Sequence, residues 1–263
     1  MQTKIMKELK GLENKYEIKI LYAVETGSRA WGFASDDSDY DVRFIYVHRE
    51  EWYLSIDQKR DVIELPINDK LDLSGWELRK TLQLFRKSNP PLMEWLNSKM
   101  VYYQAFSLVD KLKEIEPKVF SSKSALYHYL KMAKKNFLSI PENGEVKIKQ
   151  YINVLRPILA CQWIRNFNSF PPNEFQILIH SLIETGQVKQ EIVYLINRKI
   201  NGDKVILRSN VNAINHFVTE EMARIEEFAE RLQEPKEDST PMLNHLFREV
   251  LKEVWDYKIL DIL

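Results

Sequence analysis

One stretch near the start of the chain constrains the fold more than any other. An apolar run over residues 18–24 leads into a Gly27-Ser28 turn, and a second apolar run follows Asp39 and Asp41. Apolar runs of this length, bounded by turn residues, are typical of buried strands. Residues two apart in a strand point to the same side, so Asp39 and Asp41 are expected to project together. The stretch predicts two strands whose connector ends in paired carboxylates.

The chemistry of this stretch is that of phosphate transfer. Paired carboxylates suit divalent cations, which prefer oxygen ligands. The segment over residues 29–34 is expected to be a short helix, and its free N–H groups suit a phosphate. Either half alone is a weak signal, because an Asp-x-Asp is usually a solvated strand end and a Gly-Ser an ordinary turn. Their order along the chain indicates phosphoryl or nucleotidyl transfer.

That order resembles the signature of the polymerase-β-like nucleotidyltransferase superfamily. It is most similar to a branch known as RNA-ligase-associated predicted nucleotidyltransferases, and the resemblance covers about residues 17–170. The residues that carry it are Gly27 to Gly32, Ser38 to Phe44, Gly75 to Lys80, Ser88 to Pro90, Glu94 to Leu96, Lys149 to Tyr151 and Leu155 to Pro157.

The resemblance implies a metal-dependent nucleotidyltransferase. Such an enzyme moves an NMP from an NTP, here expected to be ATP, to a hydroxyl acceptor and releases pyrophosphate. Mg²⁺ or Mn²⁺ is the implied cofactor, and Gly27 and Ser28 are implied to cradle the β- and γ-phosphates. The acceptor stays open between an RNA 3′ end, a protein hydroxyl and a small molecule. Two alternatives are an inactive nucleotide-binding module and an antitoxin-like interaction protein.

A transfer reaction with two metal ions needs a third carboxylate on a strand next to Asp39 and Asp41. Asp72 is the first candidate, because leucines flank it on both sides and would point into the core while the acid points out. Glu64 shows the same alternation and is the alternative. Glu77 is the third candidate, and is more simply explained as an acid at the start of a helix.

Several cations are candidates for binding the triphosphate. Lys149 and Arg156 lie at i and i+7 of a helix expected over residues 146–167, in one polar stripe that also holds Asn153. The stripe is either a solvent-facing surface or, as the family resemblance implies, a surface that closes over the nucleotide. Arg43 is expected either to contact phosphate or to neutralise the paired acids. The full set of candidate cations is Arg29, Arg43, Lys80, Lys149 and Arg156.

Composition sets the class of protein. The 263 residues are 44% hydrophobic and 29% charged, which is ordinary for a globular protein. The 38 basic and 38 acidic residues balance, so the general basic footprint of a duplex-binding protein is absent. A single cysteine excludes an internal disulfide, and the charged N-terminus has no signal-peptide core. We expect a cytoplasmic protein with a nucleotide substrate, no membrane partner and no oligomeric state fixed by the sequence.

The expected fold class is α+β, with a small mixed sheet domain over residues 1–90 followed by a larger all-helical domain over 91–263. Hairpin connections, rather than regular βαβ alternation, argue against a doubly wound fold. Strands are expected at 17–24, 39–47, 52–56, 61–67 and 71–73. Helices are expected at 1–15, 76–87, 92–99, 105–116, 122–138, 146–167, 173–184, 187–200, 210–233 and 240–259, with a surface linker at 233–238.

Overall fold

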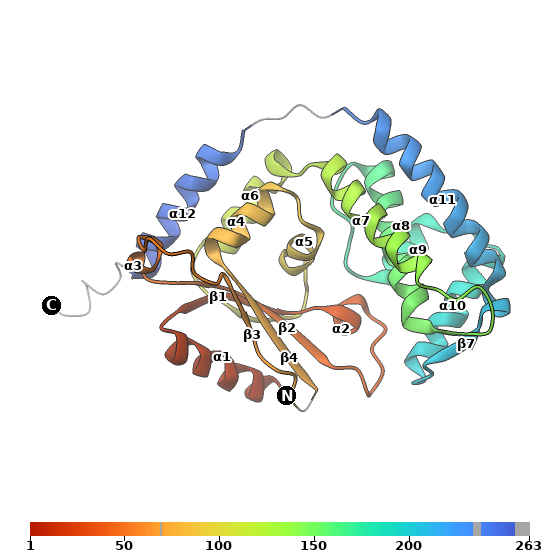
Figure 1. Ribbon diagram of the computed structural model, residues 1–263, viewed down its shortest axis with the longest axis horizontal. Coiled ribbons are helices and arrows are strands. Elements are labelled where there is room, and N and C mark those ends of the chain that lie inside the picture. Colours follow the sequence, from red (N-terminus) through yellow and green to blue (C-terminus); the bar gives the residue numbers. More distant parts are fainter. Residues whose placement is uncertain (69, 234–237, 256–263) are drawn as a thin grey trace.

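The structure is a computed structural model that describes residues 1–68, 70–233 and 238–255. It has the predicted α+β class: a mixed sheet with helices on both faces, and a group of helices beside one end of the sheet (Figure 1). The predicted linker, apart from its end residues 233 and 238, and the predicted end of the last helix lie outside the described residues.

The sheet has five strands in the order β3-β4-β2-β1-β5. β2 and β4 run parallel, whereas β1–β2, β1–β5 and β3–β4 are antiparallel pairs. The mixed character predicted from the sequence is therefore confirmed. The strands are β1 (Lys19–Glu25), β2 (Tyr40–Val47), β3 (Val62–Glu64), β4 (Leu71–Glu77) and β5 (Val101–Gln104).

Three local predictions in this region are wrong. Residues 52–56 form no strand, because Leu54 and Ile56 are exposed and give the segment no buried face; a short helix, α3 (Glu50–Tyr53), occupies its start. β4 continues to Glu77 instead of ending near residue 73, since its partner β2 extends equally far. β5 was missed altogether, because its four residues are half-exposed and show no alternation.

The two faces of the sheet have different covers. α1 (Gln2–Tyr16) contacts β1 and β5, and its Ile5 and Leu9 belong to one apolar cluster with Val42 and Phe44 of β2. The next residues in the alternation, such as Ile45, point to the opposite face. That face is covered by the helices α4 (Leu78–Arg86), α5 (Pro90–Leu96), α6 (Leu108–Val119) and α12 (Thr240–Trp255). α12 returns to the sheet from the far end of the chain and lies beside α4 (Figure 1).

The second group of helices is built around α8 (Ile148–Phe167). This helix is buried around most of its circumference by its neighbours, so the predicted polar stripe does not face solvent along its whole length. A small hairpin of β6 (Glu145–Lys147) and β7 (Val205–Leu207), three residues per strand, was not predicted. The surrounding helices are α7 (Ser122–Leu138), α9 (Phe175–Leu182), α10 (Gln187–Ile200) and α11 (Asn212–Arg231), with a 3-10 turn at Arg208–Val211.

The predicted domain boundary after residue 90 stays a prediction. The apolar core crosses this position, because residues of α5, α6 and α12 pack with β1 and β2 in one cluster. None of the helices in the described ranges is long and apolar enough to cross a bilayer.

Candidate active site

Asp41 and Asp72 are direct partners in the parallel ladder between β2 and β4. Partners in register point to the same face of a sheet, so the two carboxylates project together. Asp39 lies just before β2 and is exposed. Glu64 lies on the edge strand β3 and pairs with Arg60 at the surface. Glu77, the third candidate, caps the start of α4. Of the three candidates for the third acid, Asp72 is the one beside Asp41, and its catalytic role stays a prediction.

Arg43 joins the two acids. Its Nη2 atom is 2.8 Å from Asp72 Oδ2 and 3.5 Å from Asp41 Oδ1. Its Nη1 atom also donates to the backbone carbonyl of Asp72 at 3.2 Å. Of the two roles expected for Arg43, the structure shows the neutralising one: a single guanidinium compensates both carboxylates.

The backbone around Asp41 is held by its neighbours on β1. The Asp41 N–H donates to Glu25 Oε1 at 2.9 Å, and the Asp41 carbonyl accepts from the Thr26 N–H at 2.8 Å. Glu25 is fully buried, and its other oxygen accepts from the Tyr102 hydroxyl. Burial raises the pKa of Glu25. Sequence reasoning gave Glu25 no role, although a glutamate ending an apolar strand just before the Gly-Ser turn was the available signal.

Asp41 is a partly buried carboxylate whose pKa is influenced by two other acids and two cations. Burial raises its pKa, and the charges of Asp72 and Asp39 add to this effect. Arg43 and Lys149 act in the opposite direction. The pKa of Asp41 is raised because these two cations do not offset its burial and the two neighbouring carboxylates.

Gly27 fits against Asp41 because it has no side chain. A Cβ atom on Gly27 would lie 2.2 Å from Asp41 Oδ2, and the glycine has φ +62°, a left-handed conformation that L side chains rarely adopt. α2 (Gly27–Trp31) begins at this residue. The Gly27-Ser28 turn is thereby brought directly beside the carboxylates.

Arg29 holds the connector that leads from α2 to β2. Its Nε donates to the Asp39 carbonyl at 3.1 Å, and its Nη2 donates to the Ser38 carbonyl at 2.8 Å. The guanidinium carbon also lies 3.8 Å from the centre of the Tyr40 ring. These contacts fix the segment that presents Asp39 and Asp41.

Two of the candidate cations lie in other surroundings. Lys80 is in the first turn of α4 and pairs with Asp61 at 3.0 Å. It lies beyond the far end of β4, whose last residue, Glu77, is about 17 Å from Asp72 at ~3.3 Å per strand residue. Arg156 is buried, pairs with Glu94 at 2.6 Å and lies 4.2 Å from the centre of the Trp31 ring. Of the two alternatives for the stripe, the solvent-facing one does not hold at Arg156, because neighbouring helices enclose this side of α8. The triphosphate-binding role of Arg156 stays a prediction.

Two lysines of the helical group face the carboxylate end of the sheet. Lys149, at the start of α8, is exposed and close enough to lower the pKa of Asp41. Lys199, near the end of α10, reaches the Ser35 hydroxyl in the connector at 3.4 Å. Lys199 was not found from the sequence, since a lysine on an amphipathic helix carries no signal of its own.

The carboxylate set fits a divalent cation by its donor chemistry. All three acids supply oxygen. Burial and, to a smaller extent, repulsion by Asp72 and Asp39 raise the pKa of Asp41, and a bound cation would offset both effects. Within the ranges that the structure describes, no three acidic, cysteine or histidine side chains are already gathered around one point. Arg43 holds the place between Asp41 and Asp72, so a cation there requires this guanidinium to move aside.

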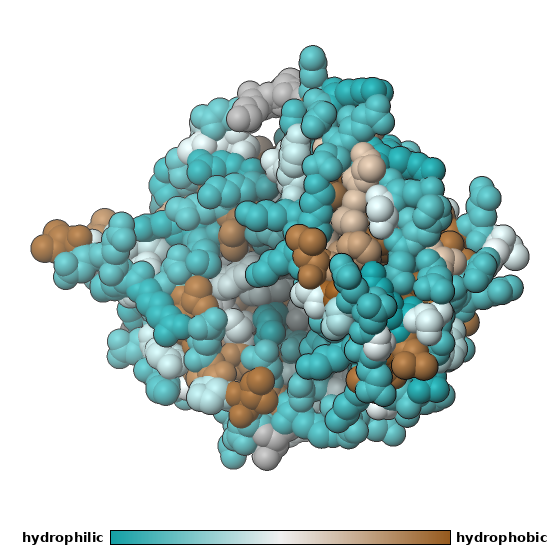
Figure 2. Space-filling view, turned by 45° about the vertical axis from the view of Figure 1, so that its right-hand side comes forward, coloured by the Kyte–Doolittle hydropathy of each residue, from teal (hydrophilic) through white to brown (hydrophobic). Residues whose placement is uncertain are grey.

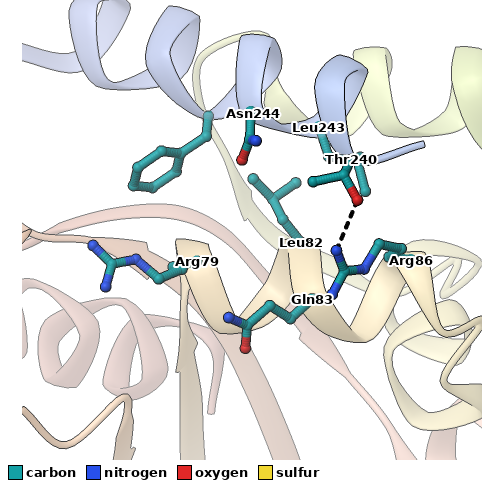
Figure 3. A pocket seen from close by; sticks show the side chains of 8 residues that line it. Arg79, Leu82, Gln83, Arg86, Thr240, Leu243 and Asn244 are labelled. Carbon is teal, nitrogen blue, oxygen red and sulfur yellow. Dashed lines mark hydrogen bonds between the residues drawn. The ribbon is translucent and has the colours of Figure 1, made fainter. Parts of the chain in front are cut away.

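A separate cavity of about 220 Å³ lies between α4 and α12 (Figure 3). Leu82 and Leu243 form its apolar part, and Arg86 donates to the Thr240 hydroxyl at its edge. None of the candidate carboxylates lines it. The side of the molecule drawn in Figure 2 is largely hydrophilic and hollowed near its centre.

Comparison with known proteins places the chain in a family. The model of the RNA repair pathway DNA polymerase beta family matches residues 1–249. The uncharacterized protein YcgL of Bacillus subtilis (strain 168) is 50% identical over 255 residues, covering 97% of this chain and 98% of that protein. A solved nucleotidyltransferase-like protein from Exiguobacterium sibiricum 255-15 matches 98% of this chain and 90% of its own, at 12% identity and a TM-score of 0.31, too low to carry an argument. The predicted resemblance is confirmed, and the chain belongs to the RNA repair pathway DNA polymerase beta family.

Proposed function

We propose that the chain is a metal-dependent nucleotidyltransferase that transfers an NMP from an NTP to a hydroxyl and releases pyrophosphate. The observation that supports this most is the meeting of three parts at one end of the sheet. Asp41 and Asp72 are partners on adjacent strands, and the Gly27-Ser28 turn lies against Asp41. An inactive nucleotide-binding module is expected to lack a third acid beside the pair, so the position of Asp72 favours an enzyme.

In this proposal, Asp39, Asp41 and Asp72 hold Mg²⁺ or Mn²⁺. A divalent cation bound there supplies positive charge to the α-phosphate and to the leaving pyrophosphate. Asp72 orients the incoming hydroxyl and accepts its proton. Gly27 and Ser28 donate backbone N–H groups to the phosphates. Glu25 holds Asp41 in position through its backbone N–H and touches no substrate.

Arg43 has a defined part in this scheme. Its guanidinium neutralises Asp41 and Asp72 before substrate binds. Once released from the carboxylates, the same group is free to pair with a phosphate, because arginine binds phosphate and carboxylate oxygens with the same forked geometry. The release keeps the charge of the site balanced as the substrate enters.

We propose an RNA 3′ end as the acceptor and ATP as the donor. The support for RNA is the description of the family, which ties it to RNA repair. The balanced net charge gives no footprint for long duplexes, so we expect a single-stranded end to be recognised.

The test is a labelling experiment with the full chain. Each α-³²P-labelled NTP is incubated with Mg²⁺ or Mn²⁺ and with three acceptor pools: RNA, protein and small molecules. We expect label in RNA, with ATP as the best donor and with chelator abolishing the reaction. Asp41→Asn is the inactive control. Labelling of protein or of a small molecule changes the acceptor, and label in no pool at any metal concentration overturns the proposed enzyme.

A further inference from the structure

Lys199 has no role in the reaction proposed above. It belongs to α10, and its ammonium group contacts the Ser35 hydroxyl of the α2–β2 connector, 164 positions away in the chain. The side chain is partly buried, and burial together with the charge of Lys149 lowers its pKa. Among the residues that the structure describes, no carboxylate lies within ion-pair distance of Lys199 or Lys149.

A structural role does not account for this arrangement. The two ammonium groups are close enough to repel each other, and their charges are only partly compensated. The charge of Asp37 acts on Lys199, but the Asp37 carboxylate is exposed and pairs with Lys70. Stabilising surface lysines pair with acids instead, as Lys134 does with Glu226 and Lys111 with Glu249. A pair of partly compensated cations beside the candidate site is suited to a ligand that brings several negative charges.

Hydrogen bonds hold Ser35, the residue that Lys199 contacts. The Ser35 N–H donates to Ser38 Oγ at 3.0 Å, and the Ser38 N–H donates to the Ser35 carbonyl at 2.9 Å. The Ser38 carbonyl in turn accepts from Arg29 of α2. This chain of hydrogen bonds fixes Lys199 relative to the Gly27-Ser28 turn, although the two come from opposite halves of the molecule.

The two lysines act at different places along the connector. The charge of Lys149 acts on Asp41, whereas Lys199 contacts Ser35, six positions before Asp41 in the chain. α8 and α10 stand on the side toward which α2 projects (Figure 1). A short polyanion that begins at the carboxylates passes Lys149 first and Lys199 second.

We propose that Lys199, oriented by Ser35, binds the terminal phosphate of the nucleoside triphosphate and that Lys149 binds the phosphate before it. This inference rests on the proposed function and extends it to a named phosphate subsite. Lys199 thereby joins the helical group to the sheet when the substrate is bound. Because Lys199 binds the terminal phosphate, which a monophosphate lacks, it favours a triphosphate over a monophosphate.

The experiment measures binding by calorimetry, independently of transfer. The full chain is titrated with inorganic tripolyphosphate, with ATP and with AMP, each in Mg²⁺ buffer. Lys199→Gln should weaken tripolyphosphate and ATP by roughly ten- to a hundredfold, as expected for a lost charge-assisted hydrogen bond, and leave AMP unchanged. Lys149→Gln should act in the same way. The matched control is Lys189→Gln on the same helix, whose ammonium donates to the Ile183 carbonyl and which should bind all three as the wild type does.

Two further variants separate binding from folding. Lys199→Arg keeps the charge and should restore most of the tripolyphosphate affinity. Ser35→Ala removes only the orienting hydroxyl and should cause a smaller loss, with no change for AMP. Circular dichroism and thermal unfolding show whether each variant is folded.

The outcomes distinguish this inference from the proposed function. Wild-type affinity for tripolyphosphate in Lys199→Gln overturns the lysine subsite even if the enzyme transfers label. Failure of the wild type to bind tripolyphosphate also overturns it. Intact binding that depends on Lys199, without label transfer to any acceptor, overturns the proposed reaction and leaves the subsite standing. A short single-stranded RNA is titrated in parallel, and a loss of affinity in Lys199→Gln that is confined to this RNA would assign the lysines to the acceptor and overturn the subsite.

Discussion

At the scale of single residues, Asp41 is the most constrained position of the site. The pKa of Asp41 is raised in the folded protein, so the folded state holds this proton more tightly than the unfolded chain does. The contribution of Asp41 to the free energy of unfolding is therefore largest below the pKa of an unfolded aspartate, and it is lost as the pH rises through the pKa of the folded state. Asp41→Asn should therefore gain stability relative to the wild type as the pH rises from about 4 to neutral. The same variant should lose transfer by about a thousandfold or more. Urea unfolding at two pH values and the labelling assay measure both effects. Near-normal turnover would contradict the assignment of Asp41 to the metal site.

Gly27 gives the second prediction at this scale. Gly27→Ala forces an L side chain into a left-handed conformation, which costs about 1–2 kcal/mol, and drives its Cβ into the Asp41 carboxylate. The variant should be less stable and should lose transfer. Gly11→Ala is the matched control, because Gly11 lies inside α1 with nothing near its Cβ position. That control should be neutral or stabilising by up to ~1 kcal/mol in urea unfolding. Equal behaviour of the two variants would contradict the close packing at Gly27.

At the scale of elements, the connector between α2 and β2 is anchored in the helical group. Phe33 follows α2 in the chain, yet it is buried in the core around α8, with its ring centre 5.7 Å from that of Phe175. Phe33→Ala should lower the free energy of unfolding by about 3–5 kcal/mol, the usual cost of truncating a buried phenylalanine. Phe33→Leu should cost much less, since it keeps most of the apolar volume. Urea unfolding measures the difference, and a loss below about 1 kcal/mol in the alanine variant would show that the connector is not anchored there.

At the scale of the whole molecule, Arg156 and Glu94 link α8 to α5, which packs on the sheet side. Glu94 Oε1 also accepts a hydrogen bond from Tyr129, and both charged residues are largely buried. Arg156→Met leaves a buried carboxylate unpaired and should destabilise the fold by about 3–5 kcal/mol. The double variant Arg156→Leu with Glu94→Leu should recover a large part of this loss, because no buried charge is left alone.

The same ion pair also helps to decide between two possible roles of Arg156, in folding and in triphosphate binding. If Arg156 contacted the triphosphate, as the polar stripe suggested, then its replacement would weaken ATP binding in a folded protein. The ion pair predicts a loss of thermal stability with the ATP affinity of the folded fraction unchanged. Calorimetry below the unfolding temperature separates these outcomes.

The sequence by itself determined the local features of this protein. Gly27, Ser28, Asp39 and Asp41 were found from the chain alone because turn chemistry and strand alternation act over a few residues. Aliphatic residues flank both Asp72 and Glu64, and Asp72 was chosen by its place at the end of the sheet segment and its shorter side chain. The alternation and the position in the segment can both be read from the order of residues. The short strands β5, β6 and β7 were not predicted, because three or four residues are too few to show the alternation of a strand.

Only the tertiary structure decided which elements lie opposite one another. The parallel register of β2 with β4 sets Asp72 beside Asp41, and it also puts Arg43 between them. The packing of α8 among its neighbours buries Arg156, although its spacing from Lys149 was that of an open polar stripe. Lys199 meets Ser35 across most of the chain. The reason is physical: periodicity states which side of a helix or strand is apolar, whereas the partner of its polar side is chosen by packing of the whole chain.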